Sequence, residues 1–152
     1  MPDESTILRF RHRLEKHKLA DQILATVNGP SHTVQGLLLK AGTAVDATLI
    51  PASSSTKNKG KARDPEMHSS CNGKQWYFGI KAHIGVDADS GLGHTVRGTS
   101  GNVVDVTEGN RLLHGEEIID GFREAGYQGV QKRPDTKKGV AWDVTMLPGK
   151  RK

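Results

Sequence analysis

Residues 76–87 read WYFGIKAHIGVD, and this stretch has the clearest alternation of apolar and polar side chains in the chain. The apolar face holds Trp76, Phe78, Ile80, Ala82, Ile84 and Val86, and the other face holds Tyr77, Lys81, His83 and Asp87. Alternation over this length is typical of a half-buried β-strand. Turn-forming residues 88–91 and a second alternating run over 92–99 follow, so the sequence predicts an antiparallel hairpin.

A further strand is predicted upstream, over residues 43–50, which read TAVDATLI. Asp46 lies among the apolar residues of this run. Strands disfavour Asp, and an unpaired carboxylate in an apolar surrounding is costly, so Asp46 needs a partner. Either a backbone amide or an Arg supplies it, which makes Asp46 structural, or Asp46 joins other carboxylates in holding a divalent cation. Both readings stay open from the residues alone.

The remaining segments are assigned from spacing and composition. Residues 3–27 have apolar side chains at helical spacing with Asp3 as the N-cap, and Asn-Gly-Pro at 28–30 ends this pattern. Asp105 and Glu108 have the spacing of a capping box and open a short helix. The other expected elements are a polar loop over residues 51–74, an extended segment over 117–124 and a final alternating run over 140–146. The sequence therefore predicts an α/β fold.

Composition limits the classes of protein that fit. The chain has 152 residues, a formal net charge of +5 and a pI of about 9.4, which points weakly to nucleic acid as a partner. No apolar run approaches the roughly 18 residues that span a bilayer, and residues 1–5 are polar, so we expect neither a membrane protein nor a secretory signal. Cys71 is the only cysteine, which excludes an intramolecular disulfide and favours a cytoplasmic location.

Several ordered blocks of the chain resemble one known family. In order they are GTAVDATLI, STKNKGKARDPEMHSS, GKQWYFGIKAHIGVDADSGLGHTV, NVVDV, LLHGEE, EAGYQGV and KRP, preceded by the helical DESTILRFRHRLEKHKL. The sequence resembles the DDE-type transposases of bacterial insertion sequences, and within them the insertion-sequence-five group. Several blocks at compatible spacing over nearly the whole chain are far stronger evidence than a single motif.

The resemblance implies a ribonuclease-H-like fold, in which carboxylates on separate elements hold metal ions. By this resemblance Asp46 is the first catalytic carboxylate, and Glu124 takes the second position, where the family has Asp. Two Mg²⁺ ions held in this way would support metal-dependent DNA strand cleavage and transfer, the chemistry of DNA transposition. The third carboxylate of the family is a later Glu, and beyond Glu124 the sequence offers only Asp135 and Asp143.

The sequence is therefore interpreted as a C-terminally truncated transposase. The expected parts are an N-terminal helical segment, residues 1–30, and an incomplete ribonuclease-H-like mixed sheet over 41–152, with a basic loop at 51–75. We expect such a fragment to be inactive in transposition on its own, and the alternative is a non-catalytic DNA-binding remnant. The implied partner is DNA at transposon ends, and a homo-oligomer of the chain is an open alternative.

Basic side chains are the candidates for DNA contacts. The set consists of Lys57, Lys59, Lys61, Arg63, Lys132 and Arg133, which either contact phosphates or form a solvated surface. A second and less favoured hypothesis is a zinc site that combines His68 and Cys71 with His83 and Asp87. The favoured interpretation places His83 as a hydrogen-bonding residue beside Asp46. Asp87 is either a turn residue at the strand end, which is the favoured reading, or an auxiliary acid near the metal ions.

Overall fold

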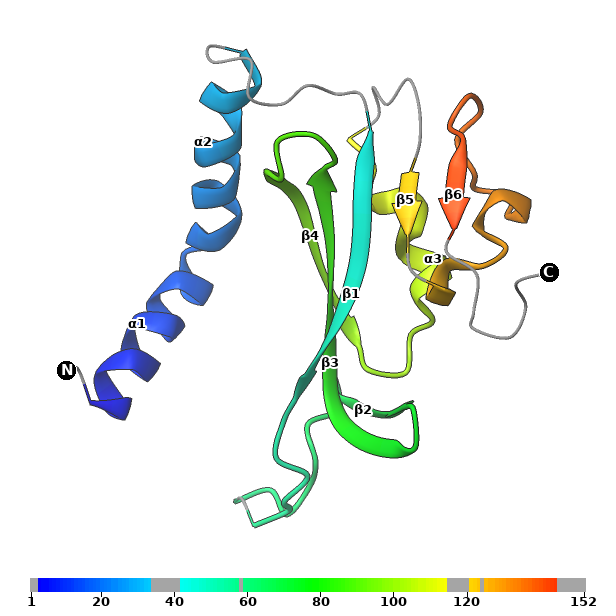
Figure 1. Cartoon of the computed structure of the whole chain (residues 1–152). Helices are drawn as coiled ribbons and strands as arrows, with labels where there is room; N and C mark the ends of the chain where they lie inside the picture. The colour runs from blue at the N-terminus through cyan, green and yellow to red at the C-terminus, as the bar shows by residue number, and fades with distance from the viewer. Residues whose placement is uncertain (1–2, 34–41, 58, 115–120, 124, 145–152) are drawn as a thin grey trace. The chain divides into compact units, whose positions relative to one another are not determined.

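The structure is a computed structural model that describes residues 3–33, 42–57, 59–114, 121–123 and 125–144 (Figure 1). The chain forms two compact units, Met1–Leu38 and Leu39–Lys152. In the described residues the first unit is helical and the second holds the sheet. None of the helices in these ranges is both long enough and apolar enough to cross a membrane.

The N-terminal unit consists of helices α1 (Glu4–Lys16) and α2 (Leu19–Thr33). The predicted N-cap is confirmed, because Asp3 Oδ1 accepts a hydrogen bond from the backbone N–H of Thr6 at 2.8 Å. The predicted helix end at residues 28–30 is wrong, since α2 continues to Thr33. Pro30 lies in the last turn of α2. Proline has no backbone N–H, so one intrahelical hydrogen bond is lost there, but the helix continues for one more turn.

The second unit holds a mixed six-stranded sheet. Its strands are β1 (Thr43–Pro51), β2 (His68–Asn72), β3 (Gln75–Asp87), β4 (Gly93–Ser100), β5 (Gly121–Arg123) and β6 (Trp142–Val144). Strand β3 pairs antiparallel with β1 on one side, and on its other side with β2 along its first half and β4 along its second half. Beyond β1 the sheet continues with β5 and β6, both in parallel pairing.

The predicted β3–β4 hairpin is confirmed by this pairing. The loop predicted over residues 51–74 is wrong in its last part, because His68–Asn72 form β2 against the start of β3. Of the extended segment predicted over 117–124, the structure describes only β5, and the alternating run over 140–146 appears as β6.

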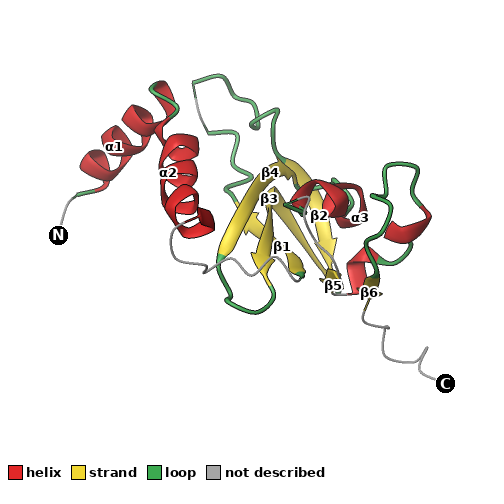
Figure 2. Cartoon of the chain, turned by 90° about the horizontal axis from the view of Figure 1, so that it is seen from above, coloured by secondary structure: helices red, strands yellow, loops and turns green. Residues whose placement is uncertain are grey.

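One face of the sheet is covered by α3 (Asp105–Glu108) and by 3₁₀ turns (Figure 2). The turns span Gly109–Leu112, Ala125–Tyr127 and Val130–Lys132. The core beneath them joins Val45 of β1 to Leu112 and Tyr127, all nearly or fully buried. On this face, β1 therefore packs against the segment that follows β5, through Val45 and Tyr127.

The covered face of β3 is the one with the polar residues. His83 and Asp87 are 0% and 1% exposed, whereas Ile80 and Ile84 on the other face are only half-buried. The expectation that the apolar face would be the buried one is therefore wrong. Gly85 explains the difference, since a Cβ there would overlap the Leu112 carbonyl, so the helical turn packs directly on the strand backbone.

The predicted capping box does not form. Asp105 is the first residue of α3, and Val104 occupies the N-cap position without a side-chain hydrogen bond. The Asp105 carboxylate instead binds Lys81, and the Glu108 carboxylate binds Arg97 and Arg111. Ion pairs to β3 and β4, together with the local pair to Arg111, take the place of the capping bonds, and the helix continues only as a 3₁₀ turn to Leu112.

Candidate active site

Asp46 lies in the middle of β1 and is exposed. Its neighbour across the sheet is Ile84 of β3, on the face that α3 does not cover. Asp46 Oδ1 accepts a hydrogen bond from the backbone N–H of Ala47 at 2.7 Å. The expected burial penalty is therefore absent, and one of the two expected partners, a backbone amide, is present. The carboxylate remains accessible from solvent.

The parallel pairing of β1 with β5 sets the position next to Asp46. Thr43, Ala44 and Val45 pair with the residues of β5, and the last pair joins Val45 to Arg123. Asp46 is the next residue of β1, and Glu124 is the next residue of the sequence after Arg123. Glu124, the second predicted catalytic and metal-binding residue, lies outside the described residues. The structure thus places Asp46 one residue beyond Val45, the partner of Arg123 in the described part of β5.

His83 is not beside Asp46. It pairs in register with Ala47, so its side chain lies on the covered face, opposite to that of Asp46. His83 Nε2 is 2.8 Å from Thr99 Oγ1, which confirms the hydrogen-bonding role but not the location. Burial lowers the pKa of His83 below its usual value of 6.5. The neutral ring is therefore favoured in the folded protein.

The zinc hypothesis is wrong for these side chains. Asp87 Oδ1 accepts hydrogen bonds from Asp89 N, Ser90 N and Ser90 Oγ, which confirms its role in the turn after β3. His68 Nδ1 is 2.7 Å from Ser100 Oγ, and Cys71 Sγ is directed to the Gly73 carbonyl. Within the ranges that the structure describes, no three His, Cys, Asp or Glu side chains are close enough to share a metal ion.

The described residues consequently provide a single member of the expected metal-ligand set. Asp46 has the right donor chemistry, since Mg²⁺ prefers carboxylate oxygens. A two-metal site needs several such oxygens from separate elements. Asp46 alone does not make one.

The predicted DNA-binding residues lie in two segments. Lys57, Lys59 and Lys61 are exposed in the loop between β1 and β2. In the same loop Arg63 places its guanidinium carbon 5.4 Å from the centre of the Phe78 ring, a cation–π distance.

The other two residues follow the core contact at Val130. Lys132 is exposed, and Arg133 forms an ion pair with Asp135, with 3.0 Å between Nε and Oδ1. This pair partly neutralises the second segment.

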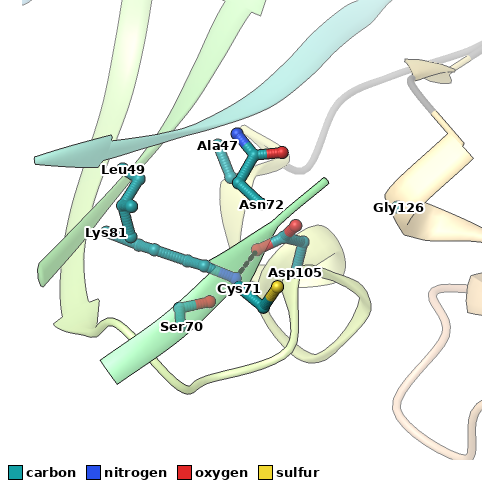
Figure 3. A pocket seen from close by; sticks show the side chains of 8 residues that line it. All are labelled: Ala47, Leu49, Ser70, Cys71, Asn72, Lys81, Asp105 and Gly126. Carbon is teal, nitrogen blue, oxygen red and sulfur yellow. Dashed lines mark hydrogen bonds and ion pairs between the residues drawn. The ribbon is translucent and has the colours of Figure 1, made fainter. Parts of the chain in front are cut away.

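A cavity of about 270 Å³ lies on the covered side of the sheet (Figure 3). It is lined by Ala47, Leu49, Ser70, Cys71, Asn72, Lys81, Asp105 and Gly126. The Lys81 ammonium points across it to Asp105, at 2.8 Å, and also donates to the Val103 carbonyl at 2.9 Å. Sequence reasoning missed this pair, although a Lys on the polar face of a predicted strand was a visible signal. Its charges cancel, so it ties elements together rather than forming a charged ligand site.

The chain matches a model of a known protein family. No solved structure matches the chain. The family model described as the transposase DDE domain matches residues 38–145, which include β1 to β6 of the described residues and the carboxylate of Asp46. This match covers well over half of the sequence, and the chain belongs to the family of transposases with a DDE domain.

Proposed function

We propose that this chain acts on the DNA of an insertion sequence of the insertion-sequence-five group, and that its sheet carries the catalytic carboxylates. Its family membership gives DNA transposition as the general activity, DNA as the partner and a divalent metal as the usual requirement. The observation that carries the proposal is the parallel pairing of β1 with β5, whose described pairs run from Thr43 with Gly121 to Val45 with Arg123, next to Asp46 in β1. In the sequence a carboxylate residue follows each member of the described pair Val45–Arg123, Asp46 in one case and Glu124 in the other.

The strand order supports a ribonuclease-H-like fold as part of this proposal. β4, β3 and β1 form an antiparallel set, and β5 and β6 extend it in parallel. In the ribonuclease-H-like fold that the resemblance implies, the strands that carry the first two carboxylates are neighbours, as β1 and β5 are here. Short β2 is an addition at the edge of β3.

Asp46 and Glu124 are the proposed metal-binding residues, with Mg²⁺ as the proposed cation. When bound, such ions activate the attacking oxygen and stabilise the leaving oxygen of phosphoryl transfer. The exposed position of Asp46 on the uncovered face leaves it accessible to a DNA backbone. Glu in place of Asp at 124 moves the carboxylate by about one ångström, and displacements of this size can cost roughly a hundredfold in rate.

The third carboxylate has no Glu to supply it in the sequence after Glu124. We therefore propose that this chain alone does not complete strand transfer. The second candidate function is DNA binding without catalysis, and the exposed lysines of the β1–β2 loop favour it. The two candidates differ in their dependence on metal and on Asp46.

A nicking assay on supercoiled plasmid, with Mg²⁺ and with Mn²⁺, separates the candidates. The catalytic proposal expects metal-dependent nicking that Asp46→Ala abolishes and Glu124→Asp increases. Asp89→Ala, which removes an exposed carboxylate from the β3–β4 turn, is the matched control and leaves nicking unchanged. DNA binding without nicking, equal in wild type and Asp46→Ala, would instead establish the binding-only function. Transposition of a terminal-repeat substrate by this chain alone would contradict the proposed inactivity.

A further inference from the structure

Trp76 is the most exposed of the large apolar side chains in the described part of the chain, at 71%. It lies near the start of β3, close to the turn at Gly73, and pairs with Cys71 of β2. An indole in this position buries little area and contributes little to the core. The fold therefore gives no reason for a tryptophan at the end of this hairpin.

The surroundings of Trp76 join it to the face of Asp46. Because β3 alternates, Trp76 and Phe78 lie on the same face as Ile84, which is the register partner of Asp46. Arg63 stacks on the Phe78 ring between them. At about 3.3 Å per residue, the strand path from Trp76 to Ile84 is roughly 26 Å. By register and alternation, the carboxylate of Asp46, the Phe78 ring under Arg63 and the exposed indole of Trp76 therefore belong to the same face of the sheet.

The two segments that flank β2 are mainly positive in charge. Exposed basic side chains in the β1–β2 loop and the β2–β3 turn are Lys57, Lys59, Lys61, Arg63 and Lys74, and the acidic ones are Asp64 and Glu66. The loop and the hairpin lie at the same end of the sheet (Figure 1). Basic groups interleaved with aromatic rings are the features of surfaces that bind unpaired nucleic acid, since bases stack on the rings and phosphates contact the cations.

We propose that Trp76 stacks on an unpaired base of bound DNA, while the basic loop contacts the phosphates beside it. The inference rests on the proposed function only in taking DNA as the ligand. Charge complementarity selects DNA over a second copy of this chain, which would bring a like-charged loop to the same place. Stacking also selects an unpaired base over intact duplex, because only an unstacked base exposes its ring face.

The test compares DNA binding by Trp76→Ala, Trp76→Phe and the wild type at fixed salt. The probes are a 20-nucleotide single strand, its perfect duplex and the same duplex with an unpaired central nucleotide. Trp76→Ala is expected to weaken binding to the single strand and to the interrupted duplex by about tenfold, with a smaller effect on perfect duplex. Trp76→Phe keeps most of the affinity. The slope of log affinity against log salt stays unchanged, because no charge is removed.

A second measurement reports on the indole itself. In a Trp142→Phe background, Trp76 is the only tryptophan, and its fluorescence is expected to be quenched by the single strand. Val104→Ala, which trims an exposed apolar side chain outside the sheet, is the matched control and leaves binding unchanged. Circular dichroism of each variant verifies the fold.

The outcomes separate the two proposals. Salt-sensitive DNA binding that Trp76→Ala leaves unchanged, or weakens equally for all three probes, overturns the stacking role and leaves DNA as the partner. Absence of DNA binding by the wild type overturns both. Self-association that disappears in Trp76→Ala, without an effect on DNA binding, assigns the indole to contacts between copies and also overturns the stacking role.

Discussion

Lys81 in β3 and Asp105 at the start of α3 form an ion pair across the cavity, with 2.8 Å between Nζ and Oδ1. Their side chains are 16% and 26% exposed, so water screens the pair only partly. Lys81 also donates to the Val103 carbonyl. The pair thus fixes the beginning of α3 against the sheet, and the Asp105 carboxylate in turn borders Gly126 in the segment after β5.

Replacing Lys81 by Met is expected to reduce the free energy of unfolding by about 1–3 kcal/mol, because Asp105 stays partly buried without its cation. The double variant Lys81→Met/Asp105→Leu should recover most of this loss, since both polar groups are then removed. Urea unfolding followed by circular dichroism measures both. A single variant within about 0.5 kcal/mol of wild type would show that the pair contributes no net stability.

Replacement by alanine should affect stability differently at two glycines of the β3–β4 hairpin, Gly85 and Gly98. Gly85→Ala is expected to destabilise the protein by about 1–3 kcal/mol, because the added Cβ would meet the Leu112 carbonyl and the His94 ring. Gly98→Ala is the matched control, since nothing lies within 4 Å of a Cβ there and its backbone needs no positive φ. Thermal unfolding of both variants tests this, and equal effects would contradict direct packing of the helical turn on β3.

Strands β1, β3 and β4 could be predicted because alternating apolar and polar side chains match the two-residue period of a strand, whereas β2, with the sequence HSSCN, has no such alternation. Which face is buried could not be predicted in the same way. Gly85 permits Leu112 to approach the backbone, and the buried His83 ring makes a hydrogen bond with Thr99 through Nε2. These contacts join residues far apart in sequence, so the local pattern of β3 contains no signal for them.

Only part of the candidate site could be predicted from the sequence. Asp46 stood out because a carboxylate conflicts with an apolar strand, and the structure resolves the conflict by exposing it. Lys81 and Asp105 gave no such conflict, since each is polar in a position that could face solvent. Their pairing depends on where α3 crosses β3, which only the tertiary structure defines. The capping-box prediction failed for the same reason.

Stability should depend on pH through His83. Burial holds its folded-state pKa below the unfolded value of 6.5, with Asp105 and Glu108 opposing this shift and Lys81 and Arg97 adding to it. The unfolded chain therefore binds the proton more strongly, so the contribution of neutral His83 is complete above about pH 6.5 and is lost as pH falls through the folded-state pKa.

The variant His83→Gln tests this contribution. It should show a weaker loss of stability between about pH 7 and pH 5 than the wild type, because Gln does not titrate. Urea unfolding at several pH values measures the slope of the free energy of unfolding. His12→Gln, which replaces an exposed histidine of α1, serves as the control. If the slope were unchanged in His83→Gln but reduced in His12→Gln, the pH dependence of stability would come from His12, and the prediction for His83 would be wrong.

Asp46→Asn should change stability by no more than about 0.5 kcal/mol, because the side chain is exposed and Asn retains an oxygen that can accept from Ala47 N. The catalytic proposal nevertheless requires this residue, so the variant should lose metal-dependent nicking while it unfolds at the wild-type urea concentration. Val45→Ala offers the opposite case, since it trims the buried neighbour and should cost about 1–3 kcal/mol. A large loss of stability in Asp46→Asn would instead make the carboxylate a structural residue of β1.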